Sequence, residues 1–285
     1  MFAIIGPTAS GKSDLAINLA LKLGYEILSL DSLSIYKEID IASAKPSPKE
    51  LSLVKHYGIN EIYPNQKFDV AKFIEIYRQI PHKKLIIVGG TGFYLKAMTE
   101  GISQMPEITE EIKKEAKKRD YKFLKSIDKN YAEKISPNDT YRIQKGIEIY
   151  LASNTPPSDY FRLNPPKPAI KDIPIFEIDV NRELLRERIR KRTEKMFKNG
   201  LIDEVAYLEK KYLDRRLPAL KAIGIKEVLD YFNGLYTYNK LKEKIITNTA
   251  RLAKRQQTFN RTQFKQKISA PLDKLEEIIL KEIRK

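Results

Sequence analysis

The chain has 285 residues, 42% of them hydrophobic, and its 53 basic and 37 acidic residues give a formal net charge of +16. This length and composition predict an ordinary globular protein with one large domain, or a core plus an insertion. The absence of cysteine excludes a disulfide framework and Cys-ligated zinc, and the two histidines, His56 and His82, leave little for a metal site. Any metal is therefore expected to be a hard ion held by oxygens and phosphate.

Apolar segments are short throughout the sequence. None approaches the roughly 20 apolar residues that span a bilayer. The apolar run at the N-terminus ends at Gly6, which does not match the pattern of a secretory signal. We therefore expect a cytoplasmic protein with no membrane partner.

The first motif is a complete phosphate loop, GPTASGKS, between an apolar strand at Phe2–Ile5 and a helical pattern that begins near Asp14. Its lysine, Lys12, and its backbone N–H groups at a helix N-terminus are expected to bind polyphosphate. The hydroxyl of Ser13 is placed to ligand Mg²⁺. The predicted phosphate-binding residues are Gly6, Pro7, Thr8, Ala9, Ser10, Gly11, Lys12 and Ser13.

Further apolar runs predict the other strands of a sheet. They lie at Ile27–Leu30, Leu85–Val88 and Ile175–Val180, and helical patterns separate them. Strands that alternate with helices favour a parallel sheet with helices on both faces. We therefore predict an α/β fold of the P-loop NTPase type.

The sequence pattern changes between the predicted strands at Leu85–Val88 and Ile175–Val180. From Pro106 to about Pro168 the sequence predicts charged helices followed by a proline-rich loop. We interpret this stretch as a helical insertion. The expected organisation is a first part of the core at residues 1–105, the insertion at 106–168, and a returning strand with a helical, basic C-terminal part at 169–285.

Two segments carry most of the excess positive charge. Arg251–Lys267 has six basic residues and no acidic one, interleaved with Gln, Asn and Phe, a mixture suited to phosphate and base contacts in RNA. Arg182–Lys198 has eight basic and three acidic residues. Its side chains at Arg186, Arg190 and Lys191 face either phosphate or water, and composition leaves both open.

Asp31 follows the second predicted strand, so it lies at the carboxyl edge of the sheet beside the phosphate loop. An acid there can be a Mg²⁺ ligand, a general base or an N-cap for the following turn. The third predicted strand ends at Val88 and Gly89 without the carboxylate that an ATPase of this fold uses to organise Mg²⁺ and water, which disfavours ATP hydrolysis. A second glycine-rich turn follows, in which Thr91 can hydrogen-bond a ligand.

Six segments together resemble one family. In chain order they read GPTASGKS, DSLSIYKEIDIASAKPS, GGTGFYLKA, PNDTYRIQKGIEIY, LKAIGIKEV and AKRQQTFNR, and they are similar to the motifs of bacterial tRNA dimethylallyltransferases over nearly the whole chain. The resemblance implies transfer of a dimethylallyl group from its diphosphate to the exocyclic amine of the adenosine immediately 3′ of the anticodon. It also implies tRNA and dimethylallyl diphosphate as partners, Mg²⁺ as cofactor, and no protein partner, so that we expect a monomer.

The resemblance also implies roles for individual residues. Asp31 is expected to accept the proton of the acceptor amine, Lys12 with Mg²⁺ on Ser13 to stabilise the leaving diphosphate, and Thr8 and Thr91 to position the leaving oxygen and the acceptor. The insertion is expected to grip the anticodon stem. The residues implied for tRNA binding are Asp31, Ser32, Leu33, Ser34, Thr91, Tyr141, Arg142, Ile143, Gln144, Lys145, Lys221, Lys226, Lys254, Arg255 and Gln256.

The sequence departs from the family pattern at a few positions. Ser13 replaces the usual threonine and keeps its hydroxyl, whereas Tyr141, Lys145 and Phe259 replace a common glutamine, arginine and tryptophan. Three other functions remain open from the residues alone. A P-loop kinase has no use for the basic tail, a prenyltransferase of free adenine nucleotides does not need the insertion, and an RNA-dependent ATPase requires a carboxylate after the third strand.

Overall fold

A computed structural model describes residues 1–81 and 84–284 of the chain. It divides into two compact units, one built from residues 1–96 and 171–285 and one from residues 97–170. Each unit is described by itself. His82 lies outside the described residues, and no helix among those described combines the length and the apolar character needed to cross a bilayer.

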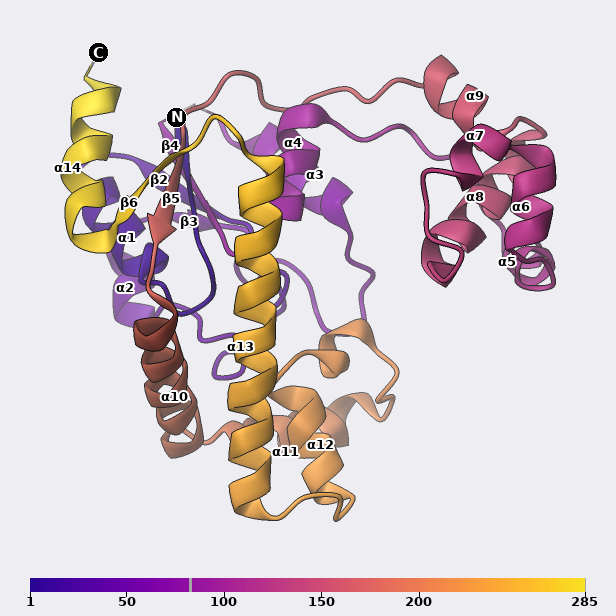
Figure 1. The fold of residues 1–285 in the computed structure, drawn as a ribbon. Helices are drawn as coiled ribbons and strands as arrows, with labels where there is room; N and C mark the ends of the chain where they lie inside the picture. The colour runs from indigo at the N-terminus through magenta and orange to yellow at the C-terminus, as the bar shows by residue number, and fades with distance from the viewer. Residues whose placement is uncertain (82–83, 285) are drawn as a thin grey trace. The chain divides into compact units, whose positions relative to one another are not determined.

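The first unit is built on one sheet whose six strands are all parallel, in the order β3-β2-β4-β1-β5-β6 (Figure 1). The strands are β1 (Phe2–Ile5), β2 (Glu26–Ser29), β3 (His56–Tyr57), β4 (Leu85–Gly89), β5 (Ile175–Asp179) and β6 (Ile268–Pro271). Every residue of the central strands β1 and β4 is buried, as expected for strands covered on both faces. The predicted α/β class with a P-loop type of parallel sheet is confirmed.

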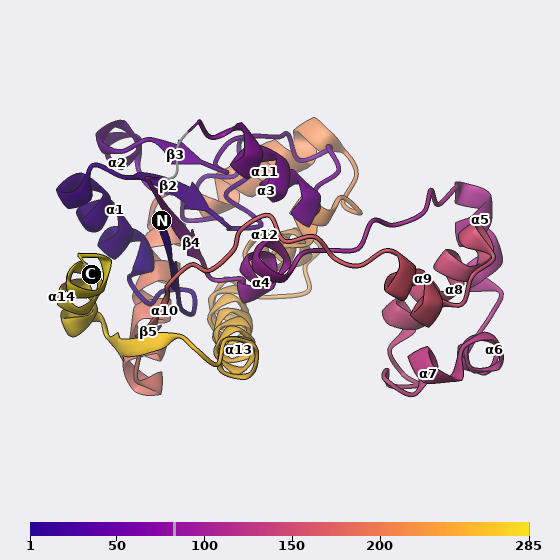
Figure 2. The same ribbon diagram turned by 90° about the horizontal axis from the view of Figure 1, so that it is seen from above.

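Helices cover both faces of this sheet, and α10, α11 and α12 lie beyond the ends of its strands (Figure 1). The helices of the first unit are α1 (Lys12–Leu23), α2 (Pro48–Leu53), α3 (Val70–Gln79), α4 (Gly92–Glu100, which runs into the second unit), α10 (Arg182–Lys198), α11 (Leu201–Tyr212), α12 (Ile225–Phe232), α13 (Tyr238–Gln263) and α14 (Leu272–Ile283), with a short 3₁₀ turn at Pro218–Lys221. On one face α1 and α14 lie side by side against the strands, and α3 lies on the other (Figures 1 and 2).

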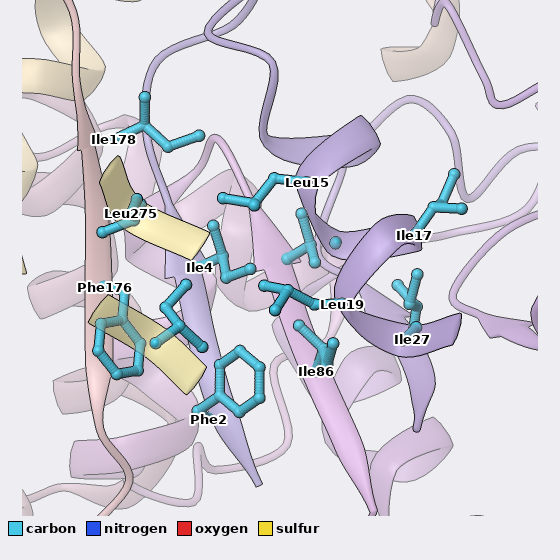
Figure 3. Packing of buried hydrophobic residues seen from close by; sticks show 14 of the residues in the cluster. Phe2, Ile4, Leu15, Ile17, Leu19, Ile27, Ile86, Phe176, Ile178 and Leu275 are labelled. Atoms are coloured by element: carbon cyan, nitrogen blue, oxygen red, sulfur yellow. The ribbon is translucent and has the colours of Figure 1, made fainter. Parts of the chain in front are cut away.

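Side chains from three strands pack under α1 and α14 and form the core on that face of the sheet. Phe2, Ile4, Ile86 and Phe176 point from three strands toward the apolar side of α1, including Leu19 (Figure 3). On β1 and β4 the side chains between them are also buried and point to the opposite face. Burial on both faces holds the strand ends in place, and the site lies at those ends.

The second unit is entirely helical apart from an isolated bridge between Ile102 and Lys167. Its helices are α5 (Glu110–Lys117), α6 (Tyr121–Ile127), α7 (Lys129–Ala132), α8 (Thr140–Ser153) and α9 (Pro157–Leu163). They enclose a small core of their own around Leu124 and Ile147. The buried Asp128 joins two of the helices, because its carboxylate accepts hydrogen bonds from the backbone N–H of Tyr131 and of Ser158.

Candidate active site

The phosphate loop connects the carboxyl end of β1 to the first turn of α1. Its backbone enters the left-handed region at Ala9 (φ 62°) and at Gly11 (φ 93°). This angle favours glycine at position 11, and a Cβ there would also displace the end of the Leu272 side chain, since it would lie 2.8 Å from one of its methyl groups. Lys12 folds back over the loop, and its Nζ donates to the carbonyl of Pro7 at 3.3 Å. The lysine is thereby held over the concave side of the loop.

A cavity of about 350 Å³ opens beside this loop, at the carboxyl ends of β1, β2 and β4. This is the edge of an open α/β sheet at which ligands bind. Ten of the residues predicted for the site line the cavity: Thr8, Lys12, Ser13, Asp31, Ser32, Leu33, Ser34, Thr91, Lys221 and Gln256. The structure thus brings together the loop lysine, the predicted base and the second glycine-rich turn.

Asp31 lies two residues beyond the end of β2, and one of its carboxylate oxygens is already in use. Its Oδ1 accepts hydrogen bonds from the backbone N–H of Leu33 at 2.8 Å and of Ser34 at 3.0 Å. The carboxylate therefore holds the turn that follows, as an Asx turn does, and it also faces the cavity. The cap and the catalytic role that the sequence left open are geometrically compatible.

Burial lowers the pKa of Lys12 to about 8. The positive charge of Arg192 acts in the same direction, while the negative charge of Asp31 opposes both. Burial also lowers the pKa of Arg192, again against Asp31. Two desolvated cations thus share one cavity with the carboxylate of Asp31, so an anionic ligand would offset the cost of burying their charges.

Arg192 and Arg188 are functional candidates that the sequence interpretation missed. Arg192 donates from Nη1 to Oγ1 of Thr8 and from Nη2 to the carbonyl of Ser43, each at 3.2 Å, and Arg188 donates to the carbonyl of Ser10 at 2.8 Å. The spacing of these two arginines along α10 could have revealed them. Both arginines fall on the apolar face of α10 formed by Leu185, Ile189 and Met196, which is buried.

Gln256 of α13 also supports the phosphate loop. Its Oε1 accepts a hydrogen bond from the backbone N–H of Thr8 at 2.8 Å. Its Nε2 lies so close to Gly90 that a Cβ there would be 2.7 Å away, and the Nζ of Lys12 would be 3.5 Å from the same point. The glycine after β4 therefore gives Gln256 and Lys12 the space in which they approach the backbone.

Other residues predicted for tRNA binding lie elsewhere. Lys226 donates to Asp230 at 2.6 Å, and Arg255 is exposed on α13. Lys254 lines a different depression on α13. None of these three side chains lines the cavity beside the phosphate loop.

The remaining predicted residues belong to α8 in the second unit. Tyr141 and Arg142 are exposed, with 71% of Tyr141 accessible, whereas Ile143 is buried in the core of that unit. Gln144 donates to the carbonyl of Arg119 at 3.2 Å, and Lys145 donates to Glu148 at 2.6 Å.

The residues in the cavity suit a magnesium ion that is held mainly by a substrate. Among the described residues no group of three or more His, Asp or Glu side chains is close enough to hold a metal by itself. The cavity does present the hydroxyl of Ser13 and the carboxylate of Asp31 beside the phosphate loop. Mg²⁺ commonly binds through one or two such oxygens together with phosphate oxygens and water.

His56 lines the cavity as well, but its geometry is that of a packed residue. Its Nδ1 lies 2.7 Å from the carbonyl oxygen of Val54, and burial lowers its pKa. The imidazole is therefore neutral at pH 7, with one nitrogen engaged by the backbone.

Sequence and structure comparisons identify the family to which the chain is similar. The family model described as IPP transferase matches residues 34–263. A tRNA dimethylallyltransferase of Nautilia profundicola is 81% identical over 284 residues, which cover 100% of each chain, and one of Sulfurimonas denitrificans is 54% identical over 98% of this chain and 97% of its own. The crystal structure of a tRNA isopentenylpyrophosphate transferase from Bacillus halodurans superimposes with a TM-score of 0.70 and 27% identity, covering 99% of this chain and 95% of that one.

The family match begins at Ser34, within the turn that Asp31 holds, and runs through α10 and α13, the two helices that support the phosphate loop. Together with 81% identity along the whole chain, this match leaves one conclusion: the chain belongs to the IPP transferase family.

Proposed function

We propose that this chain transfers a dimethylallyl group from dimethylallyl diphosphate to N6 of the adenosine immediately 3′ of the anticodon in tRNA, and releases diphosphate. The observation that carries the proposal is that Lys12 and Asp31 line one cavity, where we assign Lys12 to bind the diphosphate and Asp31 to act as the base. The strand β4 ends in Gly89 rather than in a carboxylate that would position a hydrolytic water, which distinguishes the site from that of an ATPase.

The donor end of the reaction is assigned to the phosphate loop. Lys12 and Arg192 neutralise charge on the diphosphate as its bond to C1 of the prenyl group breaks. The hydroxyl of Thr8 accepts a hydrogen bond from Arg192 of α10, and its backbone N–H donates one to Gln256 of α13. These two helices therefore hold Thr8 at the position that we assign to the departing oxygen. Ser13 would hold Mg²⁺ on the diphosphate, where the ion supplies further positive charge to the leaving group.

The acceptor end is assigned to Asp31. N6 of the adenine forms a bond to C1, the C1–O bond breaks, and the proton lost from N6 passes to the carboxylate of Asp31. Thr91, in the turn before α4, also lines the cavity and is assigned to orient the amine. The adenine has to leave the stacked anticodon loop to reach this point, at a cost of about a few kcal/mol.

The prenyl chain is assigned to the apolar part of the same cavity. Its lining includes Ala42, Met196, Ile223, Ile245 and Leu252. Met196 and Ala42 are neighbours, since both lie within 4 Å of the position of a Cβ on Gly224. A five-carbon group buried against these side chains is shielded from water, which suppresses hydrolysis of the donor.

The tRNA contacts are assigned as the resemblance implies. Ser32, Leu33, Ser34 and Lys221 line the cavity at the flipped base, and the exposed side chains of α8 are assigned to the anticodon stem. Lys226, Lys254 and Arg255 contribute positive charge outside the cavity, where phosphate contacts position RNA without reading its sequence.

The test is transfer of radiolabel from dimethylallyl diphosphate to unmodified tRNA, beside free AMP, ADP and ATP as acceptors. Label in tRNA alone is the expected result. Label only in a free nucleotide would instead identify a small-molecule prenyltransferase. No label with any acceptor, together with phosphate release from ATP, would restore the kinase and RNA-dependent ATPase alternatives.

A further inference from the structure

A second depression lies between α10 and α13, with a volume of about 1080 Å³. Its floor is the end of β5 and part of β6, and its walls are the two helices, which pack side by side and run in opposite directions (Figure 1). An apolar cluster that includes Leu185, Ile189 and Ala253 underlies it, and Ile189 lines both this depression and the catalytic cavity. We call it the α10–α13 groove.

Two rows of cations border the α10–α13 groove. The row on α10 is Arg182, Arg186 and Arg190, and the row on α13 is Arg251, Lys254 and Arg261. All six side chains belong to exposed residues. Within the described parts of the chain, none of the six forms an ion pair with a carboxylate.

The acidic residues of the groove lie at one end. Glu177 and Asp179 are on β5, and Glu177 is paired with Lys267 at 3.5 Å. Three other cations of α10 are engaged elsewhere, since Lys191 pairs with Glu187 at 2.5 Å and Arg188 and Arg192 hold the phosphate loop. The positive charge of the groove is therefore left uncompensated along most of its length.

The spacing of the rows indicates an extended ligand. At about 1.5 Å per residue, Arg182 to Arg190 spans about 12 Å and Arg251 to Arg261 about 15 Å. A single phosphate would reach one or two of these cations, whereas a chain of phosphates can meet both rows. Thr247, Gln257 and Thr258 also line the groove and add hydrogen-bonding groups suited to sugar and phosphate oxygens.

We propose that the α10–α13 groove binds a stretch of the sugar–phosphate backbone of the tRNA substrate, outside the nucleotides at the catalytic cavity. The inference rests on the proposed function for the identity of the RNA. One helix connects the two sites, because Gln256 of α13 faces the catalytic cavity while Lys254 and Thr258 face the groove. RNA bound in the groove is therefore held against the helix that supports the phosphate loop.

The test compares two triple variants of the full chain with equal change in charge. Arg182→Gln, Arg186→Gln and Arg190→Gln together remove the row on α10. Lys191→Gln, Lys195→Gln and Lys198→Gln together remove three exposed cations from the same helix outside the groove. Binding of unmodified tRNA is measured by fluorescence anisotropy between about 50 mM and 200 mM salt, where each lost phosphate contact lowers the slope of log K against log salt by about 0.7 to 0.9.

We expect the groove variant to lose about two units of this slope and about 100-fold in tRNA affinity at low salt. In the label-transfer assay the loss should fall on KM for tRNA. The lysine variant should keep the slope and affinity of the unaltered chain. Arg251→Gln with Arg261→Gln, on the opposite wall, should reproduce the loss and so guard against a fold defect in α10.

Three results would overturn the inference. The first is an unchanged slope and affinity in the groove variant. The second is an equal loss in the lysine variant, which would indicate a general charge effect. The third is loss of binding to inorganic diphosphate or ATP with tRNA binding intact, which would identify a site for small anions. A chain that transfers no label to tRNA fails the proposed function itself, whereas normal transfer with unchanged KM in the groove variant fails only this inference.

Discussion

Arg192 of α10 donates a hydrogen bond to the hydroxyl of Thr8 at 3.2 Å, so a residue far along the chain completes the phosphate loop. The same guanidinium holds the carbonyl of Ser43, in the segment that follows the Asp31 turn. It therefore links the phosphate loop to the segment beyond Asp31, and the first prediction concerns this arginine.

Replacing Arg192 should damage binding and release of the diphosphate. Arg192→Gln removes a buried positive charge at the leaving group, and we expect kcat/KM for dimethylallyl diphosphate to fall about 10²- to 10³-fold. Arg192→Lys keeps the charge but loses the planar fork that reaches Thr8 and Ser43 together, so it should recover only part of the activity. Steady-state kinetics with Lys195→Gln as control measures both. Activity of Arg192→Gln equal to that of the control would contradict the assignment.

The pKa of Lys12 predicts how diphosphate binding depends on pH. In the free protein this pKa is about 8, so the ammonium loses its proton above pH 8 and diphosphate should bind progressively more weakly there. Lysine in an unfolded chain has a pKa of about 10.4, so between pH 8 and this value the unfolded chain binds more protons than the folded one. Burial of the charged Lys12 therefore lowers the free energy of unfolding below pH 8, and this cost is relieved as the pH rises toward about 10.

Calorimetric titration with inorganic diphosphate from about pH 7 to about pH 10 measures this dependence, which spans the folded and unfolded pKa values of lysine. Lys12→Met serves as the reference, because it has no proton to lose at this position. A parallel pH dependence in the two proteins would show that another group is responsible.

Asp31→Asn separates the chemical role of Asp31 from its structural one. The amide keeps an Oδ1 that accepts from Leu33 and Ser34, but it no longer acts as a base. We expect kcat to fall about 10²- to 10⁴-fold with little change in thermal stability. Asp31→Ala should lose activity and also stability, because the turn loses its cap. Prenyl transfer by Asp31→Asn at the rate of the unaltered chain would exclude Asp31 as the proton acceptor.

Glu204 of α11 is predicted to hold the loop beside the active site. Its carboxylate accepts from the backbone N–H groups of Asp40, Ile41 and Ala42 at 2.8, 2.7 and 2.9 Å. Glu204→Ala leaves these donors unpaired and should lower the free energy of unfolding by about 1 to 3 kcal/mol. Urea denaturation measures this, with Asp203→Asn as a control in the same turn. Equal midpoints for the two variants would show that the loop is held by other contacts.

The strands show which elements an apolar sequence pattern can predict and which it cannot. The predicted strand at Phe2–Ile5 coincides with β1, and Leu85–Val88 lies within β4, because a strand buried on both faces needs a continuous apolar run. The edge strands β3 and β6 were not predicted. They are two and four residues long, mostly half-buried or exposed, and are defined by backbone pairing to β2 and β5 rather than by side-chain pattern.

The sequence by itself determined the phosphate loop, the approximate place of Asp31 and the glycine-rich turn before Thr91, because each depends on local backbone geometry and on its position at a strand end. Only the tertiary structure decided which cations reach the loop. Arg188 and Arg192 hold it while Arg186 and Arg190 border the α10–α13 groove, although all four lie within one basic run. Composition counts these charges equally, whereas the rotation of a packed helix directs each one to a different surface, and that rotation is set by the apolar residues between them.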